Sequence, residues 1–239
     1  MNRFIDTVLS ALFPHRCAYC GRVVPSDKFA CDECKKNLPR IVDPICEKCG
    51  RGKDKCICKK AQKYFKSIVA PFYYSGIVRD GVHAFKFRHR IANAEEYGSE
   101  MSDTVIERYR DISFDFITTV PLTDKSRRER GYNQCELLAE NISKKLGVEF
   151  RKNVIVKIFD THKQHRISPA LRRGNLIGAF DVLVPSNVEG KVILLCDDIC
   201  TTGETLNECS KMLWLYGAKE IYCVSLALTL PKNKKNIIH

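Results

Sequence analysis

The chain has 239 residues, of which 44% are hydrophobic and 28% are charged, a composition that indicates a soluble globular protein. No apolar stretch approaches the roughly 20 residues of a membrane helix, so we expect a cytoplasmic protein without a membrane span. The formal net charge of +12 favours an anionic ligand but does not choose between pyrophosphate and a nucleic-acid backbone.

Residues 1–14 have the pattern of a short amphipathic helix. Its apolar positions are Phe4, Ile5, Val8, Leu9 and Leu12. The segment lacks the small-residue cleavage site of a secretory signal. We therefore expect a helix that packs on the module following it, with contact to a membrane surface as the alternative.

The next segment is rich in cysteine, with eight of the thirteen cysteines between residues 17 and 58. Two thiolates separated by two residues form a knuckle, and two knuckles complete a tetrahedral zinc site. Disulfides are the alternative, but they require an exporting sequence. A crossed order of the knuckles remains open. The spacing predicts two structural zinc ions, one held by Cys17, Cys20, Cys31 and Cys34 and one held by Cys46, Cys49, Cys56 and Cys58.

The remaining cysteines lie in predicted strands, helices or their junctions. Buried cysteine behaves as a small apolar residue, so core filling is expected for Cys135, Cys196, Cys209 and Cys223. Cys200 lies in the turn that follows two adjacent acids, Asp197 and Asp198 (the twin acids), and a reactive thiol is the alternative to core filling there. Eight zinc-bound thiolates and two zinc ions would lower the net charge to about +8, so the positive excess survives metal binding.

Apolar periodicity replaces the cysteine-rich composition near residue 60, which predicts two units, residues 1–60 and 61–239. The predicted strands are residues 68–74, 114–120, 154–158, 191–196 and 221–228, and the predicted helices are residues 76–90, 92–109 and 131–146. A further helix is expected after residue 205, and residues 160–178 are expected to form a loop and a short helix. Strands that alternate with helices indicate an α/β fold with a mostly parallel sheet.

The run from 192 to 205 carries the most chemical information. Four apolar residues typical of a buried parallel strand precede Asp197 and Asp198. A turn between strand and helix then offers free backbone N–H groups and the helix dipole to a phosphate. The two carboxylates can accept hydrogen bonds from the vicinal hydroxyls of a sugar. An ordinary strand–turn–helix connection is the alternative. The turn residues are Thr201, Thr202, Gly203, Glu204 and Thr205.

Ligands in an open parallel sheet sit outside the carboxyl ends of the strands. The strand predicted to end at Val120 should therefore place Pro121 and Leu122 near the twin acids. Dense positive charge follows. The residues we expect to contact pyrophosphate or nucleic acid are Lys86, Pro121, Leu122, Lys125, Arg127, Arg130, Gln164 and Arg172.

The run at 192–205 resembles the phosphoribosyl-pyrophosphate (PRPP) signature of type I phosphoribosyltransferases. The resemblance implies that Asp197 and Asp198 bind the ribose hydroxyls and that the turn from Thr201 to Thr205 binds the 5′-phosphate. It also implies that the loop after the first core strand holds pyrophosphate with Mg²⁺. The chain departs from purine-type members at Thr201, where they carry an acid as a candidate base.

Nearly the whole chain resembles the ComF (GntX-like) family, which joins a cysteine-ribbon module to a phosphoribosyltransferase-like domain. Besides the cysteines and the PRPP run, the matching blocks are Phe13 to Cys17, His83 to Phe87, Arg130 to Gln134, Gln164 to Ser168, Arg172 to Asn175 and Ala179-Phe180. The resemblance implies a role in natural competence, in which incoming single-stranded DNA is handled.

Three functions follow from these observations. The first is a PRPP-binding protein that acts in DNA uptake, with single-stranded DNA and a DNA-processing partner such as a helicase. The second is an Mg²⁺-dependent phosphoribosyltransferase, a pentosyltransferase with an unassigned acceptor, in which Asp197 and Asp198 serve catalysis. The third is a non-catalytic adaptor for nucleic acid or a partner protein. An enzyme is favoured but the sequence does not decide it.

Overall fold

The computed structural model describes residues 14–56, 58, 63–122, 124–158, 180–183 and 188–231. The predicted N-terminal helix up to residue 13, the basic segment with Gln164 and Arg172, and residues 232–239 lie outside these ranges. The predicted boundary near residue 60 falls at residues 59–62, which also lie outside them, so it stays a prediction.

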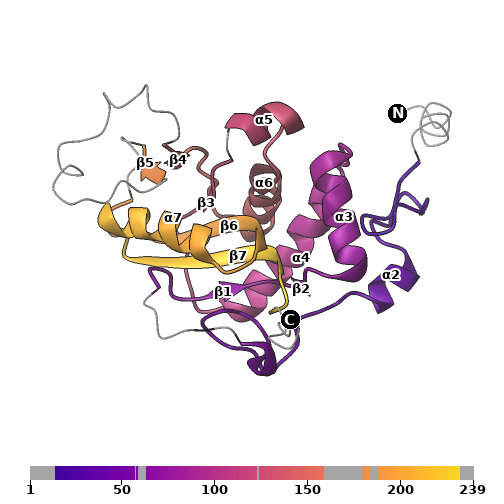
Figure 1. The fold of residues 1–239 in the computed structure, drawn as a ribbon, viewed down its shortest axis with the longest axis horizontal. Coiled ribbons are helices and arrows are strands. Elements are labelled where there is room, and N and C mark those ends of the chain that lie inside the picture. Colours follow the sequence, from indigo (N-terminus) through magenta and orange to yellow (C-terminus); the bar gives the residue numbers. More distant parts are fainter. Residues whose placement is uncertain are drawn as a thin grey trace, which may run out of the picture.

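A five-stranded parallel sheet forms the centre of the molecule (Figure 1). Its strands are β1 (Ile68–Val69), β2 (Phe72–Tyr73), β3 (Phe116–Thr119), β6 (Val192–Cys200) and β7 (Glu220–Leu228). The order is β1-β7-β6-β3, and β2 also pairs with β7. All of these pairings are parallel. This arrangement confirms the predicted mostly parallel α/β fold.

Helices cover both faces of the sheet. Alternate side chains of β6 enter different cores, because neighbouring residues of a strand point to opposite faces. Leu194 joins the core that contains α3 (Gly76–Phe87), α4 (Asn93–Arg108) and α6 (Gln134–Leu146), whereas Leu195 joins the core beneath α7 (Glu204–Leu215). Burial on both faces explains why the run at 192–195 is continuously apolar rather than alternating.

Helix termini match the sequence signals where caps are present. The side chain of Asn133 accepts a hydrogen bond from the backbone N–H of Cys135, which starts α6, and Gly147 ends it with a φ of 69°. Left-handed backbone of this kind at the end of a helix favours glycine. The predicted end of this helix at residue 146 is confirmed, whereas its start lies at Gln134 rather than at residue 131.

Three elements differ from the sequence predictions. The single strand predicted at 68–74 is split into β1 and β2 around Pro71, which has no N–H to donate to a ladder. The loop expected after the strand at 114–120 contains a helix, α5 (Asp124–Arg130). The predicted strand at 154–158 is present as β4 (Ile155–Lys157), but it pairs antiparallel with β5 (Phe180–Val182) in a separate two-stranded sheet.

The cysteine-rich segment packs against α4 and the end of the sheet. It includes α2 (Asp32–Lys36) and a short 3₁₀ helix, η1 (Lys53–Lys55). Its first half lies against α4, where Asn93 and Tyr97 both donate hydrogen bonds to the carbonyl of Ala18. Its second half lies against the end of the sheet, where the N–H of Gly52 donates to the hydroxyl of Tyr73. None of the helices in the described ranges is long and apolar enough to cross a membrane.

Candidate functional site

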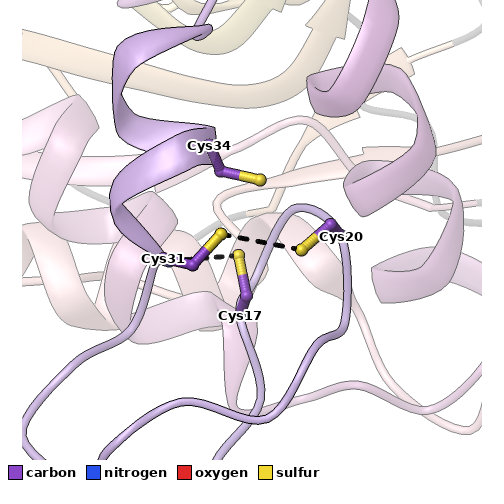
Figure 2. Close-up of side chains that lie close together, drawn as sticks. All are labelled: Cys17, Cys20, Cys31 and Cys34. Carbon is purple, nitrogen blue, oxygen red and sulfur yellow. Dashed lines mark hydrogen bonds between the residues drawn. The ribbon is translucent and has the colours of Figure 1, made fainter.

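The eight N-terminal cysteines form two separate clusters. In the first, Cys17 and Cys20 lie on one turn, Cys31 caps α2 and Cys34 lies within it, and Figure 2 shows the four side chains converging. The second cluster contains Cys46, Cys49, Cys56 and Cys58. The order is therefore sequential rather than crossed.

The sulfur spacing fits zinc and excludes disulfides. A tetrahedral ion with Zn–S bonds of about 2.3 Å has sulfur–sulfur edges of about 3.8 Å. The Sγ atoms of Cys20 and Cys31 lie 3.8 Å apart, those of Cys49 and Cys56 lie 3.8 Å apart, and those of Cys46 and Cys58 lie 3.6 Å apart. A disulfide requires about 2.05 Å, and all thirteen cysteines are free. Both donor sets therefore suit a structural Zn²⁺.

Each cluster holds one thiol that ionises easily. Burial raises the pKa of Cys20, but hydrogen bonds from the side chain and backbone of Arg22 outweigh it and lower the value to about 6. For Cys46, hydrogen bonds from the backbone of Cys49 and Lys48 outweigh burial and lower the pKa to about 7. Burial and the neighbouring thiols raise the pKa values of Cys34 and Cys58, and since the thiolate is the form that binds metal, zinc must displace the protons of these thiols.

The twin acids lie inside β6, not after it. Pairing with β3 ends where Thr119 meets Cys196, whereas pairing with β7 continues to Cys200. The acids therefore occupy a part of β6 that extends beyond its shorter neighbour. Although consecutive strand residues point to opposite faces, one carboxylate oxygen of Asp197 and one of Asp198 lie within 4.8 Å of each other and of the Cys135 sulfur.

Three groups hold these carboxylates. Lys86 Nζ lies 2.7 Å from Asp198 Oδ2, and the two side chains are only 14% and 10% exposed. Asp197 Oδ1 accepts the backbone N–H of Asp198 at 2.8 Å and faces the Cys135 thiol at 3.7 Å. In the described part of the chain, Asp197 Oδ2 and Asp198 Oδ1 accept no hydrogen bond. Two acceptor oxygens thus remain available to a ligand.

The environment shifts the protonation of Asp197. Burial and the neighbouring charge of Asp198 raise its pKa to about 7, while the N–H of Asp198 and the charge of Lys86 act in the opposite direction. Two adjacent carboxylates in a partly desolvated place resist ionising together. At neutral pH the pair therefore holds a fraction of a proton.

The end of α3, which carries Lys86, meets the block from Arg130 to Gln134. Lys86 and Phe87 end α3, and Arg130 lies over the ring of Phe87 with its guanidinium carbon 5.0 Å from the centroid. Arg130 Nη1 also donates to Gln134 Oε1 at 3.1 Å. The Nε of Arg130 and the Nε2 of Gln134 are buried and have no hydrogen-bond partner among the residues that the structure describes. Unsatisfied buried donors are costly, so an acceptor from a ligand would stabilise this corner.

The other residues that were predicted to contact pyrophosphate or nucleic acid do not all lie near the acids. Pro121 and Leu122 are half-buried directly after β3, next to the acids, because the N–H of Val120 donates to the carbonyl of Cys196. Arg127 turns toward α6, where it lies 3.2 Å from a carboxylate oxygen of Glu136. The backbone of Lys125 belongs to α5, and its side chain lies outside the description.

The turn at 201–205 joins β6 to α7. Gly203 has a φ of 80° immediately before α7 begins, a conformation that favours glycine. Thr201, Thr202, Glu204 and Thr205 are exposed, and the first N–H groups of a helix lack intrahelical partners. The turn therefore presents amides and hydroxyls to solvent at the positive end of α7, and Glu204 is free to point away from an anion.

Sequence reasoning missed Arg51 and the role of Cys135. Arg51 belongs to the second cysteine ribbon and is 1% exposed, yet its guanidinium reaches the backbone of the turn. The sequence could have indicated Arg51 because the pattern Cys-Gly-Arg occurs twice, ending at Arg22 and at Arg51. It could have indicated Cys135 because this residue directly follows the block from Arg130 to Gln134. Cys200 is buried, and burial raises its pKa to about 11, which argues against a reactive thiol there.

Comparisons with known proteins agree with both parts of the chain. A model described as a double zinc ribbon domain matches residues 8–64, and one described as a phosphoribosyl transferase domain matches residues 133–237. Among solved structures, a glutamine PRPP amidotransferase from B. subtilis is similar with a TM-score of 0.39 and 21% identity, covering 64% of this chain and 28% of that one.

Curated relatives match over most of their length. The DNA utilization protein YhgH of Escherichia coli K12 is 28% identical over 217 residues, which is 90% of each chain. Competence protein F of Haemophilus influenzae is 28% identical over 90% of this chain and 97% of its own. Competence protein ComFC of Streptococcus pneumoniae is 26% identical over 88% and 99%. The chain thus combines a match to a double zinc ribbon domain with a match to a phosphoribosyl transferase domain, and over 88–90% of its length it is similar to proteins named for competence and DNA utilization.

Proposed function

We propose that β6 and the turn after it bind a phosphorylated ribose of the PRPP kind, and that the protein uses this site in the handling of incoming DNA. The observation that carries the first part is the convergence of two carboxylates on one strand that runs directly into an amide-rich turn. Asp198 and Thr201 are three residues apart, about 10 Å along an extended strand. One sugar phosphate can reach both places.

Each group has a separate task in this proposal. Asp197 and Asp198 accept hydrogen bonds from the ribose 2′ and 3′ hydroxyls through the oxygens that remain free. The amides and hydroxyls from Thr201 to Thr205 donate to the 5′-phosphate. Lys86 places positive charge beside Asp198, and Arg130 places it over Phe87, the residue after Lys86, so the pyrophosphate group would lie there. Mg²⁺, bound with PRPP, would neutralise part of the pyrophosphate charge.

Catalysis is the second candidate function. In a phosphoribosyl transfer, the bond from C1 to pyrophosphate breaks as positive charge develops on the ring. Lys86 and Arg130 would stabilise the departing negative charge. Thr201 stands where the purine-type resemblance leads one to expect an acid, so in the described turn only Glu204 offers a carboxylate. The acceptor of such a transfer stays unassigned.

The DNA role derives from the relatives, which are named competence and DNA utilization proteins. The surface beside the acids supports it. Phe87 is 54% exposed beneath the Arg130 guanidinium, and Arg127 and Arg128 are exposed on α5. Single strands bind where aromatic rings and positive charge alternate. We propose that single-stranded DNA contacts this surface in the cytoplasm, together with a processing partner such as a helicase. An adaptor without catalysis would use the same surface.

The test measures binding of PRPP with Mg²⁺ and of a fluorescent single-stranded oligonucleotide to zinc-loaded protein. Asp198→Asn should lose PRPP affinity and retain DNA affinity, and Asp103→Asn, on the exposed face of α4, is the matched control. DNA affinity should fall steeply with salt. Failure of the intact protein to bind PRPP would remove the first part of the proposal, and failure to bind the oligonucleotide at low salt would remove the second.

A further inference from the structure

The two cysteine ribbons are repeats with one difference. Both contain Cys-x-x-Cys-Gly-Arg, ending at Arg22 and Arg51. The backbone bonds correspond, since the N–H of Cys17 donates to the Arg22 carbonyl at 2.8 Å and that of Cys46 donates to the Arg51 carbonyl at 2.7 Å. The arginine side chains nevertheless take different directions.

Arg22 stays with its own cluster. It is exposed, and its Nε and Nη2 lie 3.4 and 3.6 Å from the sulfurs of Cys20 and Cys31. It also pairs with Glu33. Its hydrogen bonds remain within the first ribbon.

Arg51 reaches beyond its own cluster to the sheet, although its Nη1 also donates to the carbonyl of Cys49 at 3.5 Å. Its Nη2 donates to the carbonyls of Thr201 at 2.6 Å and Cys200 at 3.4 Å, and its Nε donates to the carbonyl of Thr229 at 2.9 Å. One guanidinium therefore links Thr201, the first residue of the turn at 201–205 (the phosphate turn), to Thr229, which follows β7. Since Thr201 is the first residue of the turn, these bonds fix the backbone where the turn begins and use carbonyl groups, not turn N–H groups.

The charge of Arg51 has no carboxylate partner in the described residues. An isolated buried cation is unfavourable. The second cysteine cluster supplies the missing charge when it is metallated, because four thiolates with one Zn²⁺ carry a net charge of −2. The metal-free cluster would carry less negative charge near neutral pH, because the pKa values of Cys56 and Cys58 are raised, although that of Cys46 is lowered. Metal binding therefore favours the buried position of Arg51.

Close backbone contact fixes the second ribbon against the sheet. Gly50 has a φ of 68°, and a Cβ built there would lie 2.4 Å from the carbonyl oxygen of Ile68 in β1. Only glycine permits this approach. The knuckle that binds metal thus touches the sheet one residue before Arg51 reaches the turn.

We propose that Arg51 is a positioning residue that couples zinc at the second ribbon to the shape of the phosphate turn, and through it to anion binding. This inference rests on the proposed function for its consequence, the affinity for phosphate, but not for the coupling itself. Coupling is reciprocal, so an anion in the turn should also retain zinc at Cys46, Cys49, Cys56 and Cys58.

The first measurement needs no ligand. Hydrogen–deuterium exchange of the peptide that covers residues 200–206 should be about tenfold faster in Arg51→Met than in zinc-loaded wild type, within the about 5- to 150-fold range of coupled sites. Cys56→Ser, which disables the second metal site, should have the same effect. Arg22→Met and Cys20→Ser make the corresponding changes in the first ribbon and should leave this peptide unchanged.

The second measurement uses ribose 5-phosphate as the probe. Arg51→Met and Cys56→Ser should each weaken its binding about tenfold, and saturating probe should slow zinc release from the second ribbon by a similar factor. If wild type binds no ribose 5-phosphate, the proposed function fails while the exchange comparison still decides the coupling. Wild-type exchange rates in Arg51→Met, or equal effects of Cys20→Ser and Cys56→Ser, would overturn the inference. If Arg51→Met does not fold, the comparison of the two cysteine variants decides.

Discussion

Replacing Lys86 by methionine should expose how the twin acids are held. Its ammonium group lies 2.7 Å from Asp198, and both side chains are nearly buried. Removing one partner of a buried ion pair costs about 3–5 kcal/mol, because the other charge stays desolvated and unpaired. Here the loss should be greatest at pH 8, above the Asp197 pKa of about 7, where both carboxylates are ionised in the folded protein. It should shrink toward pH 5, where the folded pair retains a proton.

The measurement is urea unfolding of zinc-loaded protein at pH 5.5 and pH 8. Lys145→Met is the matched control, since Lys145 lies at the same 2.7 Å from Asp103 but the two side chains are 37% and 63% exposed. Breaking an exposed pair costs about 0–1 kcal/mol. The double variant Lys86→Met with Asp198→Asn should recover part of the loss. An equal cost for the two lysine variants at pH 8 would refute the reasoning.

Three further predictions concern protonation, backbone and metal. Because the folded pKa of Asp197 is about 7 and the unfolded value about 3.9, this group destabilises the fold progressively from pH 4 to pH 7, by at most about 4 kcal/mol. Asp197→Asn should therefore be more stable than wild type at pH 8 and lose most of this gain by pH 5, as urea unfolding of both proteins at each pH would show. Gly203→Ala should cost about 1–2 kcal/mol from its φ of 80° alone, whereas Gly50→Ala adds a backbone clash worth about 1–3 kcal/mol more, so equal thermal stabilities would contradict the structure. Metal analysis should find two zinc ions per chain in the wild type and one in Cys20→Ser or Cys56→Ser. A single ion in the wild type would show that one of the two clusters does not bind zinc.

The sequence predicted those features of the fold and the site that depend on the pattern of neighbouring residues. Cysteine spacing indicated two ribbons because chelation requires neighbouring thiolates, and the continuous apolar run before Asp197 indicated a strand buried on both faces. The end of β6 was predicted four residues too early. Carboxylates normally mark the exit from a buried strand, but pairing with β7 continues through them to Cys200.

Contacts between distant segments could not be predicted. Nothing in the run around Lys86 indicates that it meets Asp198, 112 positions later. The two Cys-Gly-Arg repeats are identical in pattern, yet only Arg51 is buried against the turn. The direction of each arginine depends on what each ribbon packs against, and that is a property of the assembled fold.

The central claim is that one sugar phosphate binds both the acids and the turn. Its most direct test is the binding of ribose 5-phosphate, ribose and inorganic phosphate to isotope-labelled, zinc-loaded protein, followed through the amide signals of Asp197, Asp198 and residues 202–206. Joining two binding groups in one molecule raises affinity well beyond either alone. We predict that ribose 5-phosphate shifts both sets of signals together and binds at least about tenfold more tightly than phosphate. Equal affinities, or shifts confined to one set, would contradict the account.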